Sequence, residues 1–264
     1  SRGDVRDLAA VDVAVARARP ELVVHLAAQP IVRESYGDPV GTIATNVLGT
    51  THVLDAVRRT SSPCPVLVVT SDKVYAVAGR DGGNAEGDAL GGADPYSASK
   101  AAADIVAGAW ARSYPAMRIA VARAGNVIGG GDATPHRLLP DIARALSAGQ
   151  PVVVRNRNSV RPWQHVLDAL HGYLLLAGGL LGANPEKYAS AWNFGPLERP
   201  LPVSEVVDHA IEAWGSGKWQ DRPDPAAPHE EAALLIDARR AAAELGWAPK
   251  WNIATAVART IGWY

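Results

Sequence analysis

The chain has 264 residues, of which 48% are hydrophobic and 20% charged, and its formal net charge at pH 7 is −1. This length and composition are those of a globular protein with a large core. The near-neutral charge argues against a nucleic-acid partner and against an acidic membrane surface, because both attract a surplus of cations. The single cysteine, Cys64, excludes an intrachain disulfide and a zinc ribbon. We therefore expect a cytoplasmic protein without a membrane segment.

The first half of the chain alternates between helix and strand patterns. In chain order, the predicted elements are a helix over 8–18, a strand over 21–26, a helix over 40–59, a strand over 66–70, a helix over 96–114 and a strand over 118–123. The loop 77–94 is rich in glycine, so we expect a flexible connection that could close as a lid. Strand–helix–strand alternation indicates parallel strands joined by right-handed crossovers. The sequence thus predicts an α/β fold with a Rossmann-like, doubly wound parallel sheet.

Beyond the three glycines at 129–131 this alternation is lost. The predicted elements are a helix over 138–147, a strand over 152–154, a helix over 165–181, a strand over 191–195, and helices over 203–213, 238–245 and 253–262. We expect residues 1–131 to form a partial dinucleotide-binding domain. Residues 132–264 are expected to form mainly a smaller, mixed α/β substrate-binding domain, with 191–196 returning to the first domain.

The glycine-rich fingerprint that normally opens a dinucleotide-binding domain does not occur before Asp4. We therefore expect the first strand–helix–strand of that domain to be missing. Either the chain is a fragment or that part is absent from the protein.

Two polar motifs lie where the first predicted domain should place its chemistry. Ser71, Asp72 and Lys73 follow a buried strand, and enzymes with parallel sheets place their chemistry at the carboxyl ends of strands. Tyr96 and Lys100 are four residues apart on the next helix and therefore share one of its faces. A nearby ammonium favours the phenolate of a tyrosine, whose usual pKa is ~10, and so creates a base that works near neutral pH. The alternative is a solvated Tyr–Lys pair on an exposed face.

Several further stretches carry the motifs of one enzyme family. They lie at 3–7, 25–30, 44–50, 70–73, 90–100, 123–132, 155–156, 161–166 and 191–196. With them the chain resembles extended short-chain dehydrogenase/reductases and, within these, the nucleotide-sugar 4,6-dehydratases, most of all the branch that acts on CDP-glucose. Ser-Asp-Lys and Arg-Pro-Trp-Gln-His are specific to that branch, whereas Tyr-x-x-x-Lys is shared across the superfamily. The sequence departs from the pattern in a thinned loop at 77–88 and at Ala133, where the family has tryptophan.

The resemblance implies an NAD-dependent lyase that converts CDP-glucose to CDP-4-keto-6-deoxyglucose through an internal redox cycle. In such an enzyme Tyr96 takes the proton of the sugar 4-hydroxyl. Lys100 lowers the pKa of Tyr96 and holds the nicotinamide ribose, and Ser71 hydrogen-bonds the same sugar oxygen. Asp72 protonates the departing 6-hydroxyl, and Lys73 removes the C5 proton. The alternative for Lys73 is an orienting charge near the substrate, because lysine acts as a base only when it is neutral.

The resemblance also implies which residues bind the two ligands. The cofactor-binding residues, besides Tyr96 and Lys100, are Asp4 and Val5 beside the adenine, and Leu26, Ala27, Ala28 and Gln29 beside the phosphates and ribose. The substrate-binding residues are Asn126, Arg137, Arg155, Asn156, Arg161 and, by a weaker match, His229. Guanidinium groups suit a diphosphate, although a lone arginine is more often a surface residue. We expect no metal site, because no metal-ligand spacing links the histidines.

Other interpretations stay open at this point. The chain could be a 4,6-dehydratase for another nucleotide sugar or a 4-epimerase, although the Asp72–Lys73 pair disfavours an epimerase, which needs no acid at C6. From a different class, it could be a truncated, inactive nucleotide-sugar-binding protein. The resemblance also implies a homodimer formed through the helices 40–59 and 96–114.

Overall fold

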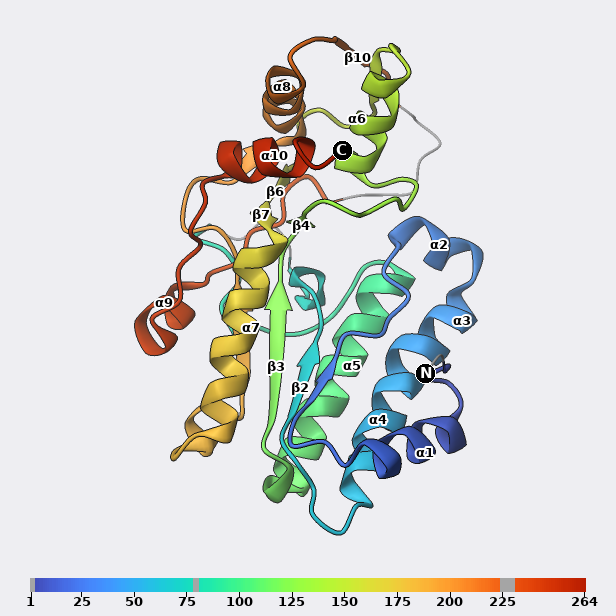
Figure 1. The fold of residues 1–264 in the computed structure, drawn as a ribbon, viewed down its shortest axis with the longest axis vertical. Helices are drawn as coiled ribbons and strands as arrows, with labels where there is room; N and C mark the ends of the chain where they lie inside the picture. Colours follow the sequence, from blue (N-terminus) through green and yellow to red (C-terminus); the bar gives the residue numbers. More distant parts are fainter. Residues whose placement is uncertain (1–2, 78–80, 224–230) are drawn as a thin grey trace. The chain divides into compact units, whose positions relative to one another are not determined.

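The structure is a computed structural model that describes residues 3–77, 81–223 and 231–264. The chain forms two compact units that interleave along the sequence (Figure 1). The first unit comprises residues 1–77, 85–124 and 172–193, and the second comprises 78–84, 125–171 and 194–264. The functions assigned above to the two predicted domains stay predictions.

A four-stranded sheet in the order β1-β2-β3-β8 forms the centre of the first unit. Its strands are β1 (Val23–His25), β2 (Val66–Val69), β3 (Ile119–Ala124) and β8 (Ala191–Phe194). β1 and β3 both run parallel to β2, with Val66 paired to Val23 on one side and to Ile119 on the other. β2 is a continuous apolar run and β3 is apolar except for Arg123, and both are buried almost throughout, as expected for a parallel sheet covered on both faces. The predicted Rossmann-like parallel sheet is confirmed.

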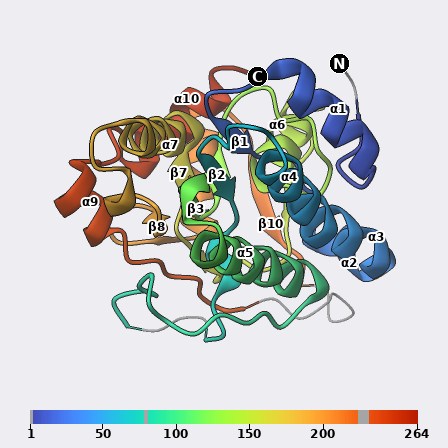
Figure 2. The ribbon, with the colours of Figure 1, turned by 90° about the horizontal axis from the view of Figure 1, so that it is seen from below.

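Helices cover both faces of this sheet. They are α1 (Leu8–Ala18), α2 (Val32–Gly37), α3 (Pro39–Ile43), α4 (Gly49–Arg58), α5 (Pro95–Ser113) and α7 (Val166–Leu181), with short 3₁₀ turns η2 (Asp72–Val74), η3 (Pro115–Met117) and η4 (Pro185–Lys187). α4 and α5 lie on one face, and the part of α7 that belongs to this unit lies on the other (Figure 2). α5 begins close to the predicted start. The side chain of Asp94 accepts a hydrogen bond from the Ser97 amide, and Pro95 suits the first helical turn because a backbone N–H there would have no partner within the helix.

The helix predicted over 40–59 differs from the expected single α-helix. It consists of α3, a π-helical turn η1 (Ala44–Leu48) and α4 in direct succession. The amide of Gly49 donates to the carbonyl of Ala44, five residues earlier, which is the wide π-type hydrogen bond. A single π turn hardly changes the apolar periodicity, so the sequence pattern does not reveal it. Asn46 lies buried in this turn.

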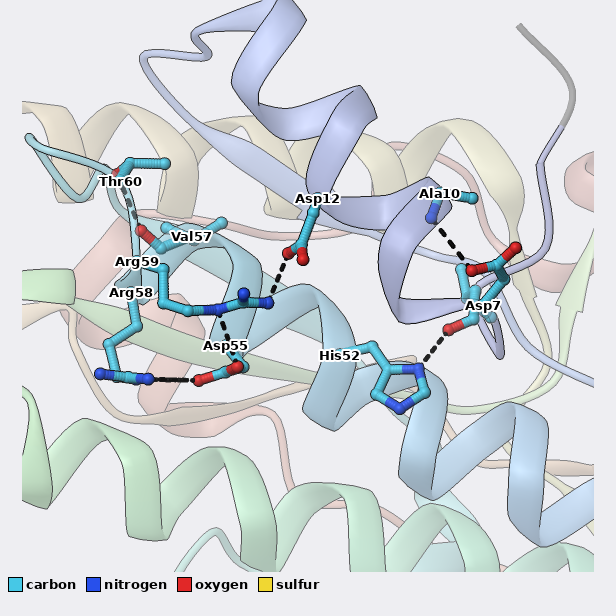
Figure 3. A network of polar contacts seen from close by, with 10 residues as sticks. Asp7, Ala10, Asp12, His52, Asp55, Val57, Arg58, Arg59 and Thr60 are labelled. Atoms are coloured by element: carbon cyan, nitrogen blue, oxygen red, sulfur yellow. Dashed lines mark hydrogen bonds and ion pairs between the residues drawn. The ribbon is translucent and has the colours of Figure 1, made fainter.

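α1 and the segment before it are held against α4, as the close-up in Figure 3 shows. The ring nitrogen Nδ1 of His52 lies 2.9 Å from the carbonyl oxygen of Val5. Gly49 permits this close approach, because a Cβ at that position would lie 2.7 Å from the Val5 side chain. Arg59, which directly follows α4, donates to Asp12 on α1 at 2.5 Å, an exposed ion pair that adds little stability.

The second unit has its own apolar core between three helices and three two-stranded sheets. The helices are α6 (Leu138–Ser147), α8 (Val203–Trp214) and α10 (Ile253–Ile261), with α9 (Arg239–Leu245) beside them in sequence. The strand pairs are β5 (Val152–Val154) with β10 (Trp219–Asp221), β4 (Val127–Ile128) with β7 (Gln164–His165), and β6 (Val160–Arg161) with β9 (Leu201–Pro202). Most of these strands have only two residues and leave no periodic pattern, which is why the sequence predicted β5 alone.

In the three described ranges, every helix is too short or too polar to cross a membrane.

Candidate active site

The Ser71-Asp72-Lys73 segment lies at the carboxyl end of β2. The amide of Thr70 donates to the carbonyl of Ala122 at 2.9 Å and so extends the pairing of β2 with β3 by one residue. The hydroxyl of Ser71 accepts from the Lys73 amide at 3.2 Å and donates to the Asp72 carboxylate at 3.0 Å. Ser71 and Asp72 are both buried. The segment is thus a closed, hydrogen-bonded turn rather than an open loop.

Tyr96 and Lys100 lie on the first two turns of α5. The amide of Tyr96 donates to the hydroxyl of Ser35 at 3.1 Å, and the ammonium of Lys100 donates to the carbonyl of Val69, the last residue of β2, at 3.1 Å. Tyr96 is only 8% exposed and Lys100 only 7%. The alternative of a solvated pair on an exposed face is therefore wrong.

Burial decides the electrostatics of Lys100 and of a histidine beside it. Loss of hydration lowers the pKa of Lys100 to about 8, although the carboxylate of Asp104 acts in the opposite direction. Burial also lowers the pKa of His25 to about 4, and the charge of Lys100 adds to that effect. The ring nitrogen Nε2 of His25 lies 3.0 Å from the Thr50 hydroxyl. At neutral pH His25 is therefore uncharged, while Lys100 is charged but close to its titration range.

Tyr173, which the sequence analysis missed, connects the two motifs. Its phenol is buried, and burial together with the charges of Tyr96 and Asp72 raises the pKa of Tyr173 well above its usual range. The charges of Tyr96 and Asp72 thus both act on this one phenol, although the two residues come from different elements. No sequence signal marks Tyr173, since it occupies an ordinary position in the apolar pattern of α7.

The structure gives Lys73 an acidic neighbour. Its ammonium lies 3.9 Å from the carboxylate of Asp94, the residue that caps α5, and its side chain is 17% exposed. This contact holds the Lys73 side chain beside the start of α5, and its role as base or as orienting charge stays a prediction.

The residues expected beside the cofactor lie at the carboxyl end of β1. Leu26 is 55% exposed and Ala27 is also exposed. Because the side chains after Leu26 are small, a ligand can approach the backbone there closely. Gln29 is held in place by Asn46, which accepts from the Gln29 amide at 2.8 Å and donates to its carbonyl at 3.1 Å. Asn46 also donates to the hydroxyl of Ser99 on α5 at 2.8 Å. The buried π turn thus ties the loop after β1 to the helix that carries Tyr96.

These surroundings fit the ribose and phosphate groups of a dinucleotide. Ligands of open α/β sheets bind outside the carboxyl ends of the strands, where the Ala27–Ala28 backbone and Lys100 lie. At the start of the chain, Asp4 is exposed and its carboxylate is paired with Arg6, which lowers the pKa of Asp4 to about 2. Val5 is half-buried against α4.

The residues expected to bind the substrate lie in the second unit and differ in exposure. Arg155 and Asn156 are exposed after β5, and Asn126 is half-buried before β4. Arg137 is half-buried, with its Nε 3.6 Å from the Asp132 carboxylate. Arg161 is buried in β6 and donates to the carbonyl of Val160 at 2.8 Å. His229 lies outside the described residues.

Within residues 3–77, 81–223 and 231–264, no group of three or more His, Cys, Asp or Glu side chains is arranged to hold a metal ion.

Comparison with known families identifies the chain. Residues 1–260 match the family described as GDP-mannose 4,6 dehydratase. The chain belongs to this dehydratase family. It is 40% identical to a CDP-glucose 4,6-dehydratase from Salmonella typhimurium, over 99% of the chain and 75% of that protein. It is 34% identical to a dTDP-glucose 4,6-dehydratase from Streptomyces antibioticus, over the whole chain and 75% of that protein.

Solved structures share the fold of this dehydratase. A UDP-glucose 4-epimerase from Thermus thermophilus in complex with NAD superposes with a TM-score of 0.88 at 25% identity, over 99% of the chain and 83% of the epimerase. A dTDP-glucose 4,6-dehydratase from Streptomyces venezuelae, with NAD and TYD bound, gives a TM-score of 0.84 at 26% identity, over 99% and 78% of the two chains. The expected membership of the nucleotide-sugar dehydratases is confirmed.

Proposed function

We propose that this protein is a lyase that converts CDP-glucose to CDP-4-keto-6-deoxyglucose with NAD as its cofactor. The observation that carries the proposal is the burial of Tyr96, Lys100 and Asp72 within one unit, with the charges of Tyr96 and Asp72 acting on the same phenol. The 40% identity to a CDP-glucose 4,6-dehydratase supports this choice of nucleotide. An NAD-bound epimerase and an NAD-bound dehydratase of the same fold support the cofactor.

Tyr96 acts as the base that removes the proton of the sugar 4-hydroxyl. Lys100, held on the Val69 carbonyl, places its positive charge on the same helix face and favours the phenolate. When bound, NAD supplies the hydride acceptor for C4 and the hydride donor for C6. Leu26, Ala27, Ala28 and Gln29 would hold its phosphates and ribose, and Asp4 and Val5 would bind its adenine.

Dehydration needs an acid at the 6-hydroxyl and a base at C5. Asp72 is the acid, and its bond from Ser71 fixes the carboxylate. Oxidation at C4 acidifies the C5 proton, and Lys73 removes it after breaking its contact with Asp94. Ser71 reorients its hydroxyl to the sugar oxygen when substrate enters.

The substrate diphosphate binds through arginines of the second unit. Arg137, Arg155 and Arg161 supply the positive charge, and Asn126, Asn156 and His229 contact the remaining polar groups of the nucleotide sugar. The protein acts in the cytoplasm as a homodimer formed through the helical run 39–58 and α5. Exposed apolar residues on these helices, Val40, Ile43, Leu48 and Ile105, are consistent with such an interface.

The test is incubation of the protein with CDP-glucose and NAD+, followed by the absorbance of the 4-keto product in alkali. We expect product with CDP-glucose, none with Tyr96→Phe, and an unchanged rate with Lys218→Met, an exposed lysine of the second unit. Turnover of dTDP-glucose or GDP-mannose but not CDP-glucose would contradict the choice of nucleotide. Epimerisation without loss of water would contradict the lyase. Absence of both turnover and NAD+ binding would favour the inactive binding protein.

The role of Lys73 can be tested separately by solvent exchange at C5. We expect Lys73→Met to retain oxidation at C4 and to lose incorporation of solvent deuterium at C5, because the base is gone. Lys73→Arg keeps the charge without an accessible neutral form, so it should behave like Lys73→Met. If Lys73→Arg retains deuterium incorporation, Lys73 is an orienting charge and another group is the base.

A further inference from the structure

A buried ion pair lies beneath the proposed active site. Arg123 on β3 donates two parallel hydrogen bonds to the carboxylate of Asp104 on α5, from Nε to Oδ2 at 2.8 Å and from Nη2 to Oδ1 at 2.7 Å. Both side chains are 4% exposed. Arg123 opens the family stretch 123–132, but neither residue has a role in the proposed mechanism.

The Asp104–Arg123 pair is hydrogen-bonded to residues on both sides of residues 71–74, the catalytic turn. On the near side, the hydroxyl of Thr70 donates to the Asp104 carboxylate at 3.0 Å. On the far side, Nη1 of Arg123 donates to the phenol oxygen of Tyr75 at 3.0 Å, and the guanidinium carbon lies 5.1 Å from the centre of the Tyr75 ring. Residues 71–74 are therefore held at each end by one rigid, planar ion pair.

The far attachment is itself fixed by two more segments. The phenol of Tyr75 donates to the side-chain oxygen of Asn193 at 2.6 Å, and the Asn193 amide donates to the Glu86 carboxylate at 3.0 Å. Nη1 of Arg123 also donates to the carbonyl of Glu86 at 2.9 Å. The guanidinium thus connects β3, the catalytic turn and the segment before α5.

The same pair reaches the base-activating lysine. Asp104 follows Lys100 by one helical turn, and its charge partly offsets the effect of burial on the Lys100 ammonium. Lys100 holds the Val69 carbonyl and Asp104 holds the neighbouring Thr70 hydroxyl. Two consecutive turns of α5 therefore fix two consecutive residues at the end of β2.

Stability alone does not explain such a pair. A buried ion pair can often be replaced by apolar residues of similar volume without loss of stability, because desolvation offsets the attraction. The first-unit core contains such residues on the same two elements, for example Ala107 on α5 and Val121 on β3. A function that needs a fixed geometry and a fixed charge explains the pair better.

We propose that Asp104 and Arg123 are positioning residues, which clamp the catalytic turn 71–74 at both ends and keep a negative charge one helical turn from Lys100. This inference rests on the proposed function, since it assigns these roles within the same site. It makes two separable predictions, one for the geometry of the turn and one for the charge of Lys100.

The two roles are separated by two variants. Arg123→Lys retains a positive charge beside Asp104 but cannot make the forked bonds to Asp104 and Tyr75 together, so we expect kcat to fall by roughly 10- to 100-fold with little change in KM. Asp104→Asn removes the negative charge beside Lys100, so we expect the alkaline limb of the kcat/KM profile to move down by roughly one pH unit. Asp12→Asn, which breaks the exposed pair with Arg59 shown in Figure 3, is the matched control and should change neither quantity.

Asp104→Asn leaves Arg123 buried without a carboxylate and can fail to fold. The double variant Thr70→Val/Tyr75→Phe removes both attachments of the turn without leaving a charge unpaired, and it should reproduce the kcat loss of Arg123→Lys. A wild-type kcat in both Arg123→Lys and the double variant would overturn the clamp. A uniform loss of rate in folded Asp104→Asn, with the alkaline limb unmoved, would overturn the charge role.

A measurement that does not depend on turnover separates this inference from the proposed function. The Lys100 ammonium can be titrated by NMR through its ε-carbon, with the signal assigned from Lys100→Arg. A lower midpoint in Asp104→Asn than in the wild type supports the charge role even if CDP-glucose is not the substrate. An unchanged midpoint overturns it, whatever reaction the protein catalyses.

Discussion

Replacing Lys100 by methionine should stabilise the protein at neutral pH while abolishing activity. In the folded state burial lowers the pKa of Lys100 from 10.5 to about 8. One pKa unit corresponds to about 1.4 kcal/mol, so keeping this buried lysine charged destabilises the fold by roughly 3 kcal/mol at pH 7. Methionine has a similar length and no charge to desolvate.

The gain is reduced by the loss of one hydrogen bond. The ammonium of Lys100 donates to the carbonyl of Val69 at 3.1 Å, and an unsatisfied buried carbonyl destabilises by about 1–2 kcal/mol. Asp104 retains its two bonds from Arg123, so it is not left without a partner. We therefore expect Lys100→Met to raise the free energy of unfolding by about 1–2 kcal/mol at pH 7.

The dependence on pH gives the decisive measurement. Between pH 8 and 10.5 the unfolded state binds more protons at this lysine than the folded state, so the stability of the wild type rises with pH through that range. Lys100→Met lacks this rise, and its advantage should disappear by about pH 10 and then reverse.

The assay is urea unfolding of both proteins at several pH values, with Lys218→Met as the control for removal of an exposed lysine. A variant that is less stable than the wild type by the same amount at every pH would refute the reasoning. It would mean that the hydrogen bond, and not desolvation, dominates at this site.

Three further predictions concern the surroundings of this lysine. His25 should titrate near pH 4 by NMR, below its usual pKa of 6.5. Between these two values the unfolded state binds a proton that the folded state does not, so the free energy of unfolding should fall by roughly 3 kcal/mol as the pH drops from 6.5 to 4. Gly92→Ala places a Cβ 2.3 Å from the Ala98 amide nitrogen on α5, so kcat should fall and the urea midpoint should drop, whereas Gly87→Ala, with open space around it, should behave as wild type. Asn46→Ala releases the Gln29 loop, so the KM for NAD+ should rise several-fold more than kcat falls, as steady-state kinetics would show.

The sequence predicted the elements that carry a long periodic pattern. The helices at 8–18 and 138–147 and the strand at 152–154 have the predicted bounds, because each has a clear apolar pattern and Asp7 also caps the first helix. The short strands of the second unit and the six-residue helix α2 were missed. Such elements are held by pairing and packing with distant segments, which a local pattern does not record.

The candidate site was predictable only where a motif names the chemistry. Tyr96 and Lys100 stand out because their spacing has a chemical reason, and Ser71 to Lys73 stand out because polar residues follow a buried strand. Asn46 and Tyr173 carry no such mark. Their importance arises from what they contact, and those contacts join residues more than 50 positions apart.

The spacing on α5 explains why the ion pair lies beneath the site and not within it. Four residues advance an α-helix by about 6 Å and turn it about 40° beyond a full revolution. Lys100 can therefore reach the Val69 carbonyl at the end of β2, and Asp104, about 12 Å along the axis from Tyr96, can reach the neighbouring Thr70 hydroxyl. Arg123, which precedes the last residue of the neighbouring strand β3, lies at the right depth to meet it. The carboxylate of Asp104 can therefore act on Lys100 without contacting the substrate. One turn earlier on α5, the same charge would lie among the reacting groups.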